Sequence, residues 1–140
     1  MQLAQEVGVG DRLHLLPAAP PDEMVRLAAC HDIGLSLELT EPFNRAICLT
    51  NKIFAYLLAG VPVLLSKTPA QAELSRQLGK AAVLVDIAEP AAIAAVLDHW
   101  FADPAKLADR RQAAWHLGQT QYNWDVEQKR FLKVVEKTLQ

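Results

Sequence analysis

The chain has 140 residues, of which 51% are hydrophobic and 21% are charged, and its formal net charge is −2. This length fits one domain with an apolar core, and the slight negative charge disfavours sequence-independent nucleic-acid binding, which needs many cations. Neither cysteine, Cys30 or Cys48, has metal-site or disulfide-framework spacing. Both are expected to be buried reduced thiols, as suits a cytoplasmic protein. The longest apolar run, 53–65, is too short for a transmembrane segment, which needs about 20 residues.

Four short apolar runs predict β-strands along the chain. They are rich in Val, Leu and Ile and are mostly apolar on both faces, which is typical of strands in a parallel sheet covered by helices. The predicted strands are 12–16, 32–38, 61–66 and 81–86.

Helix signals alternate with these strands. Thr50 and Gly60 bound one helix, Thr68-Pro69-Ala70-Gln71 forms a capping box that opens another, and Gly79 closes it. The predicted helices span about 22–31, 50–60, 68–79, 90–101, 104–118 and 125–139. The alternation predicts an α/β fold with a parallel sheet, right-handed crossovers and helices on both faces. Segment 1–10 is typical of the end of a helix with no strand before it, so we expect the natural domain to begin upstream.

The stretch 41–66 is the most informative for function. Its polar loop follows the predicted strand 32–38, and ligands of open α/β sheets bind at the carboxyl ends of the strands. The helix that begins at Thr50 offers unpaired N–H groups and a positive dipole end to a diphosphate, and Lys52 and Arg45 add cations. The alternative is an ordinary capped helix with solvated charges. No catalytic triad, P-loop or paired-histidine metal motif is present, and the scattered histidines predict surface or structural roles; they are His14, His31, His99 and His116.

The sequence TNKIFAYLLAGVPVLLSKTP at 50–69 resembles the most recognisable stretch of GT-B-type, group 1 retaining glycosyltransferases. Weaker similarities lie in the same order on both sides and cover nearly the whole chain. They comprise DRLHLL at 11–16 with PDEM at 21–24, HDIGLS at 31–36, the segment 86–93, and Tyr122-Asn123-Trp124. By resemblance the chain is a single partial domain, 1–140. It would be the C-terminal, Rossmann-like, donor-binding half of such an enzyme, truncated at its N-terminal end.

The resemblance implies a transferase that moves a glycosyl group from a nucleoside-diphosphate sugar to an acceptor. The acceptor would bind mainly to an N-terminal domain that this chain lacks, and no metal or other cofactor is implied. No catalytic residue is assigned, because catalysis would be mostly electrostatic. The implied donor-binding residues are Glu41, Asn44, Arg45, Thr50, Asn51 and Lys52.

Two departures from the family pattern leave an alternative open. Ile47 and Ala55 occupy the positions of two family glutamates, and a methyl group cannot accept hydrogen bonds from a ribose. The family's diphosphate-binding Arg and Lys would lie before Met1. The alternative is therefore a degenerate domain that serves as a non-catalytic binding or scaffolding module. Apolar surface left by a missing partner domain would promote self-association.

Overall fold

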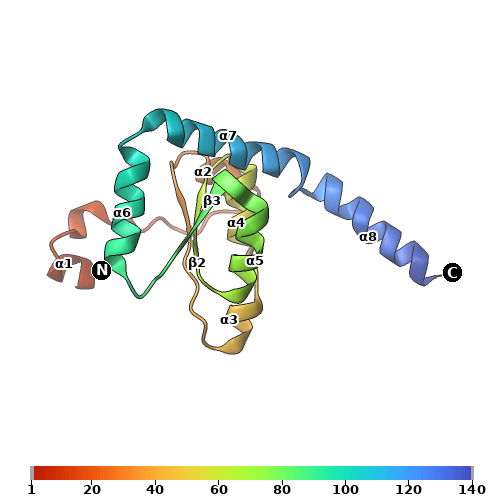
Figure 1. The fold of residues 1–140 in the computed structure, drawn as a ribbon, viewed down its shortest axis with the longest axis horizontal. Coiled ribbons are helices and arrows are strands. Elements are labelled where there is room, and N and C mark those ends of the chain that lie inside the picture. The colour runs from red at the N-terminus through yellow and green to blue at the C-terminus, as the bar shows by residue number, and fades with distance from the viewer. Residues whose placement is uncertain (1, 140) are drawn as a thin grey trace.

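A parallel β-sheet lies at the centre of the structure, a computed structural model that describes residues 2–139. Within these residues the sheet has three strands in the order β1-β2-β3: β1 (Gly34–Ser36), β2 (Val63–Ser66) and β3 (Ala82–Val85). Gly34 pairs with Val63, and Val63 pairs in turn with Ala82. The prediction of an α/β fold with a parallel sheet is confirmed, and the strands lie within three of the four predicted runs (Figure 1).

The prediction of a strand at 12–16 is wrong. Gly10–Arg12 form a short 3-10 helix (η1), and no regular structure follows until Pro21. Leu13, Leu15 and Leu16 are exposed by 40, 72 and 69%. This segment has apolar residues but no neighbouring strand to complete its backbone hydrogen bonds, and Pro17 cannot donate to a ladder.

Helices occupy most of the rest of the chain, and their ends follow the punctuation of the sequence. Thr68 Oγ1 accepts from the N–H of Gln71 at 3.3 Å, and Asp103 Oδ1 accepts from the N–H of Lys106 at 3.1 Å. Thr50 is the N-cap residue of α4, but its side chain makes no capping hydrogen bond. The helices are α1 (Gln2–Glu6), η2 (Pro21–Glu23), α2 (Met24–Ala28), α3 (Phe43–Ile47), α4 (Asn51–Leu58), α5 (Pro69–Leu78), η3 (Gly79–Ala81), α6 (Pro90–Phe101), α7 (Pro104–Thr120) and α8 (Trp124–Thr138).

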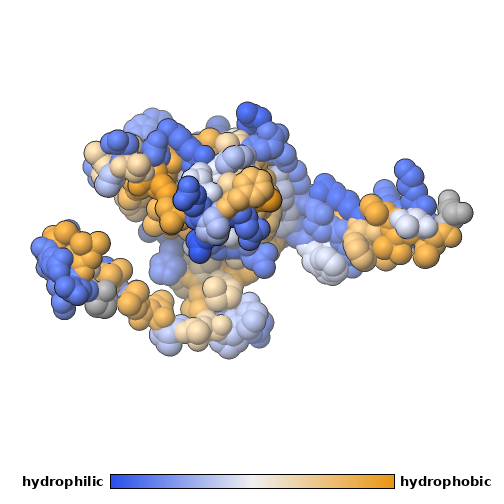
Figure 2. Space-filling view, turned by 90° about the horizontal axis from the view of Figure 1, so that it is seen from below, coloured by the Kyte–Doolittle hydropathy of each residue, from blue (hydrophilic) through white to orange (hydrophobic). Residues whose placement is uncertain are grey.

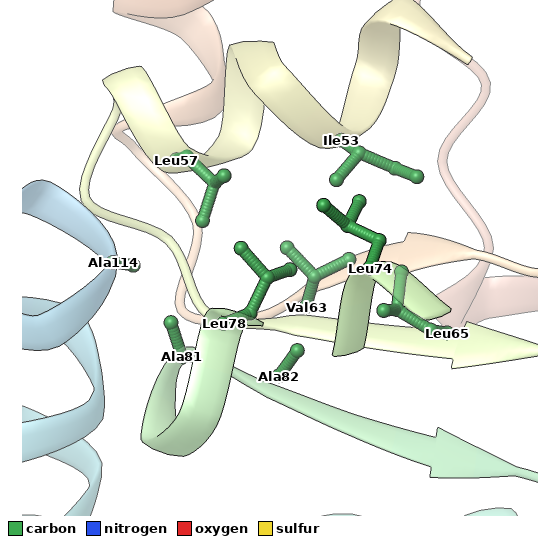
Figure 3. Close-up of a cluster of buried hydrophobic side chains, with 9 residues drawn as sticks. All are labelled: Ile53, Leu57, Val63, Leu65, Leu74, Leu78, Ala81, Ala82 and Ala114. Carbon is green, nitrogen blue, oxygen red and sulfur yellow. The ribbon is translucent and has the colours of Figure 1, made fainter. Parts of the chain in front are cut away.

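The alternation of side chains along β2 divides the core between the two faces of the sheet. Val63 and Leu65 point to one face and Leu64 to the other, and all three are fully buried. The first face packs against α4 and α5, and its cluster is shown in Figure 3: Ile53, Leu57, Val63, Leu65, Leu74, Leu78, Ala81, Ala82 and Ala114. The opposite face packs against α6 and the first part of α7, in the cluster of Leu64, Val85, Trp100 and Leu107. Helices therefore cover both faces, as predicted.

Helix α7 crosses α4 at very short range. Gly118 is buried, and a Cβ placed on it would lie 2.5 Å from the carbonyl oxygen of Leu57. Only a residue without a side chain allows the two backbones to approach so closely. This contact, together with the burial of Ile53 and Leu57, sets the position of α4 against the sheet.

The C-terminal helix α8 extends away from the sheet and its covering helices (Figure 1). None of its residues is buried, and Trp124, Phe131, Leu132 and Val134 are exposed by 68, 61, 53 and 66%. Figure 2 shows apolar surface along this helix and along the N-terminal segment at the opposite side. Such surface is typical of a region that docks on a partner.

The structure also tests the predicted thiols and membrane segment. Cys30 is exposed and Cys48 is half-buried, so the expectation of two buried thiols is wrong. Cys30 follows the last turn of α2, and its Sγ donates to the Arg26 carbonyl at 3.6 Å. Among residues 2–139, no helix combines the length and apolar character that crossing a membrane requires.

Candidate functional site

A cavity of about 500 Å³ opens at the edge of the sheet where all three strands end. We call it the strand-end cavity. It is formed by residues at or just after the end of each strand: Glu38, Leu39, Thr40 and Glu41 after β1, Ser66 at the end of β2 with Lys67 and Thr68 after it, and Asp86, Ile87 and Ala88 after β3. Because the strands are parallel, their carboxyl ends meet at one edge, which is where ligands of open α/β sheets bind.

A second, smaller cavity of about 370 Å³ lies beside the first. We call it the basic pocket, and it is lined by Glu38, Asn44, Arg45, Cys48, Thr50 and Lys52. Thr50 and Lys52 belong to the N-terminus of α4, whose first N–H groups and positive dipole end favour an anion. Glu38 lines both cavities and so forms part of the wall between them.

Glu38 is the buried charge of this site. Glu38 is only 7% exposed, and each of its two carboxylate oxygens forms an ion pair with one cation. Lys52 Nζ lies 2.6 Å from Oε1, and Arg45 Nη1 lies 3.3 Å from Oε2. The hydrogen bond from Lys52 lowers the pKa of the Glu38 carboxyl, burial opposes this effect, and the nearby positive charges of Lys52 and Arg45 add to it.

A hydrogen-bonded chain of buried polar groups lies behind Glu38 and holds its backbone. The N–H of Glu38 donates to Ser66 Oγ at 2.9 Å, and Ser66 Oγ donates to Gln71 Oε1 at 3.3 Å. Gln71 Nε2 donates to Ser36 Oγ at 3.2 Å, and Ser36 Oγ lies 3.4 Å from Thr50 Oγ1. Ser36, Ser66 and Gln71 are fully buried or nearly so. The chain connects β1, β2, α5 and the start of α4, so it fixes the strand ends relative to the basic pocket.

The structure brings four of the six predicted donor-binding residues together. Asn44, Arg45, Thr50 and Lys52 line the basic pocket, although they come from α3, α4 and the segment between them. Glu41 lies in the adjacent strand-end cavity.

Asn51 points elsewhere. It lines a separate, largely apolar pocket with Phe54 of α4, Leu74 of α5 and Tyr122 beyond α7. Asn51 is not among the residues that line the basic pocket, so the ligand contact predicted for it stays a prediction.

Sequence reasoning missed Glu38 as a site residue. The local sequence carried no signal for it, because the apolar residues of this segment are at 33, 35, 37 and 39 and the pattern places Glu38 on the polar side, whereas the structure buries 34, 36 and 38. A buried glutamate needs a cationic partner nearby, and the following helices α3 and α4 supply Arg45 and Lys52. Ser66, Thr68 and Asp86 also line the strand-end cavity. They lie at or after the ends of later strands, and no local sequence signal marked them as site residues.

The chemical character of the two cavities differs. The strand-end cavity offers hydroxyls, carboxylates and one lysine, with Lys67 Nζ 3.7 Å from Asp86 Oδ2 at its rim. The basic pocket offers a guanidinium, an ammonium and an amide. Within residues 2–139, no cluster of three or more His, Cys, Asp or Glu side chains is placed to hold a metal ion. The histidines at 14, 31, 99 and 116 are all exposed.

Comparison with known proteins found no family model, no curated protein and no solved structure that matches this chain.

Proposed function

We propose that this chain is the nucleotide-sugar-binding part of a glycosyltransferase that transfers a glycosyl group to an acceptor held by a separate N-terminal domain. The supporting observation is the convergence of Arg45, Lys52 and the N-terminus of α4 on one pocket at the carboxyl edge of a parallel sheet. The chain's resemblance to group 1 retaining glycosyltransferases supports the same activity. We expect the protein to act in the cytoplasm.

The two adjoining cavities suit the two chemical parts of such a donor. The diphosphate would lie in the basic pocket, where Arg45 and Lys52 stabilise the negative charge that develops on the leaving group. The sugar would lie in the strand-end cavity, where Thr40, Glu41 and Asp86 offer hydrogen-bond partners to its hydroxyl groups. No residue of this chain is assigned as nucleophile or general base, since charge stabilisation and positioning suffice for this role.

A titration of UDP or GDP followed by backbone amide shifts tests this proposal. We expect the shifts to centre on residues 38–52, and Lys52→Gln to weaken binding at least about tenfold, because it removes a charge-assisted hydrogen bond. Lys129→Gln is the matched control: it changes the net charge equally but lies on the exposed helix α8. Shifts confined to 100–115, or equal effects of the two variants, would contradict the proposal.

A second candidate is a non-catalytic binding or scaffolding module that kept this fold. Its supporting observation is the apolar character of Ile47 and Ala55, where the family pattern has glutamates. Ile47 ends α3 and is 56% exposed, and Ala55 is half-buried in α4. The exposed apolar residues of α8 fit a protein-binding role. A chain that folds cooperatively but binds no nucleoside diphosphate would favour this candidate over the transferase.

A further inference from the structure

The basic pocket already contains an anion of its own. Glu38 reaches both cations of the pocket, at 2.6 Å from Lys52 and 3.3 Å from Arg45. With Glu38 ionised, these three side chains carry one net positive charge rather than two. A pocket intended for a diphosphate therefore has half of its side-chain charge neutralised from within.

The Glu38 side chain is 9% exposed, far less than either cation, and its backbone is anchored. Its N–H is held by Ser66 Oγ at 2.9 Å, and Ser66 is in turn held by Gln71, which is fully buried. The two cations are freer, because the side chains of Arg45 and Lys52 are 54 and 44% exposed. Each cation has several N–H donors, and we call those that point away from Glu38 its outer donors. An arriving anion can thus reach the outer donors of Arg45 and Lys52, while the other donors stay on Glu38.

We propose that Glu38 is a built-in counter-ion that determines the affinity of the basic pocket for anions, and that it holds this affinity below what Arg45 and Lys52 alone would give. This inference rests on the proposed function, because it concerns the regulation of the same pocket. The fixed carboxylate repels a phosphate group bound to the outer donors. The pocket thereby releases its anion more readily, which suits a transferase that must discharge a nucleoside diphosphate after each turnover.

The magnitude follows from the geometry of the pocket. A phosphate that contacts the outer donors lies roughly 6 Å from the carboxylate, and at an effective dielectric constant of about 40 the repulsion corresponds to about tenfold in affinity. Removal of the charge is therefore expected to lower the dissociation constant about tenfold.

The test is calorimetric titration of inorganic pyrophosphate into the chain and its Glu38→Gln variant at low ionic strength. We expect the variant to bind about tenfold more tightly. The matched control is Glu73→Gln, which removes the same charge from an exposed pair with Arg76 on α5 and is expected to leave the affinity unchanged. Equal or weaker binding by Glu38→Gln overturns the inference, since it would mean that Glu38 only orders the two cations. Absence of pyrophosphate binding in both proteins overturns it as well.

A measurement on the unmodified chain covers the case in which Glu38→Gln does not fold. The carboxyl carbon resonance of Glu38 is expected to shift with the same midpoint as pyrophosphate binding, and an unchanged resonance overturns the inference. A parallel titration with UDP separates the two proposals. If the variant binds pyrophosphate more tightly but neither protein binds UDP, the proposed function is wrong and the counter-ion role stands. If UDP binds at the pocket and its affinity is unchanged in Glu38→Gln, the counter-ion role is wrong and the proposed function stands.

Discussion

The contact between α7 and α4 at Gly118 offers the sharpest test of the packing. In Gly118→Ala the new methyl group would lie 2.5 Å from the carbonyl oxygen of Leu57 and 2.9 Å from Cα of Leu58. Ordinary van der Waals contact begins at 3.4 Å, so the first contact is too short by about 0.9 Å. All three nearest atoms are backbone atoms, and no change of rotamer can relieve the overlap. The helices must therefore separate.

The expected cost combines two opposing terms. Overpacking of this kind lowers the free energy of unfolding by about 3 kcal/mol, at the upper end of the usual range because backbone must move. Replacing glycine by alanine inside a helix returns about 1 kcal/mol. The net loss is about 2 kcal/mol, which for a chain of this size lowers the melting temperature by roughly 4–8 °C.

Thermal unfolding followed by circular dichroism measures this change. Gln119→Ala is the control, because it adds no atoms and lies next to Gly118 on the exposed side of α7; we expect its effect to stay within about 0.5 kcal/mol. An equal or higher melting temperature for Gly118→Ala would refute the close approach of the two helices. Since α4 carries Lys52, the same variant is also expected to weaken ligand binding at the basic pocket.

Three further predictions concern other contacts. Asn123→Ala removes the cap that accepts from the N–H of Val126 at 3.0 Å, and it should cost about 1 kcal/mol and speed amide exchange in the first turn of α8; unchanged exchange would contradict the cap. Gln71→Leu removes the acceptor of the buried Ser66 hydroxyl and the amide donor to Ser36 Oγ, so urea unfolding should show a loss of about 1–3 kcal/mol, and a neutral effect would contradict the network. The lowered pKa of Glu38 means that its contribution to stability is fully present above its ordinary value of 4.5 and is lost as the pH falls through the lower folded value. The melting-temperature gap between the wild type and Glu38→Gln should therefore narrow as the pH falls below 4.5, and a constant gap would contradict the ion pairs.

Much of the local structure was determined by the sequence alone. Thr68 and Gly79 bound α5 as predicted, and Asp103 opens α7, because caps depend on groups only a few residues apart. The apolar runs at β2 and β3 predicted buried parallel strands, since a run that is apolar on both faces must be covered on both. The basic pocket was predicted in part, because Arg45 and Lys52 lie close together in the chain.

Only the tertiary structure decided the rest. The segment 12–16 has the composition of a strand, but a strand exists only where another edge pairs with it, and none does. Glu38 was within the predicted strand, but its role depends on Arg45 and Lys52 folding back over the strand end and on Ser66 holding it from β2. Asn51 and Lys52 were both predicted to bind the donor, but in the structure Lys52 lines the basic pocket and Asn51 lines a different pocket with Tyr122. Each of these outcomes depends on groups that are distant in sequence, and a local pattern carries no information about which distant groups will meet.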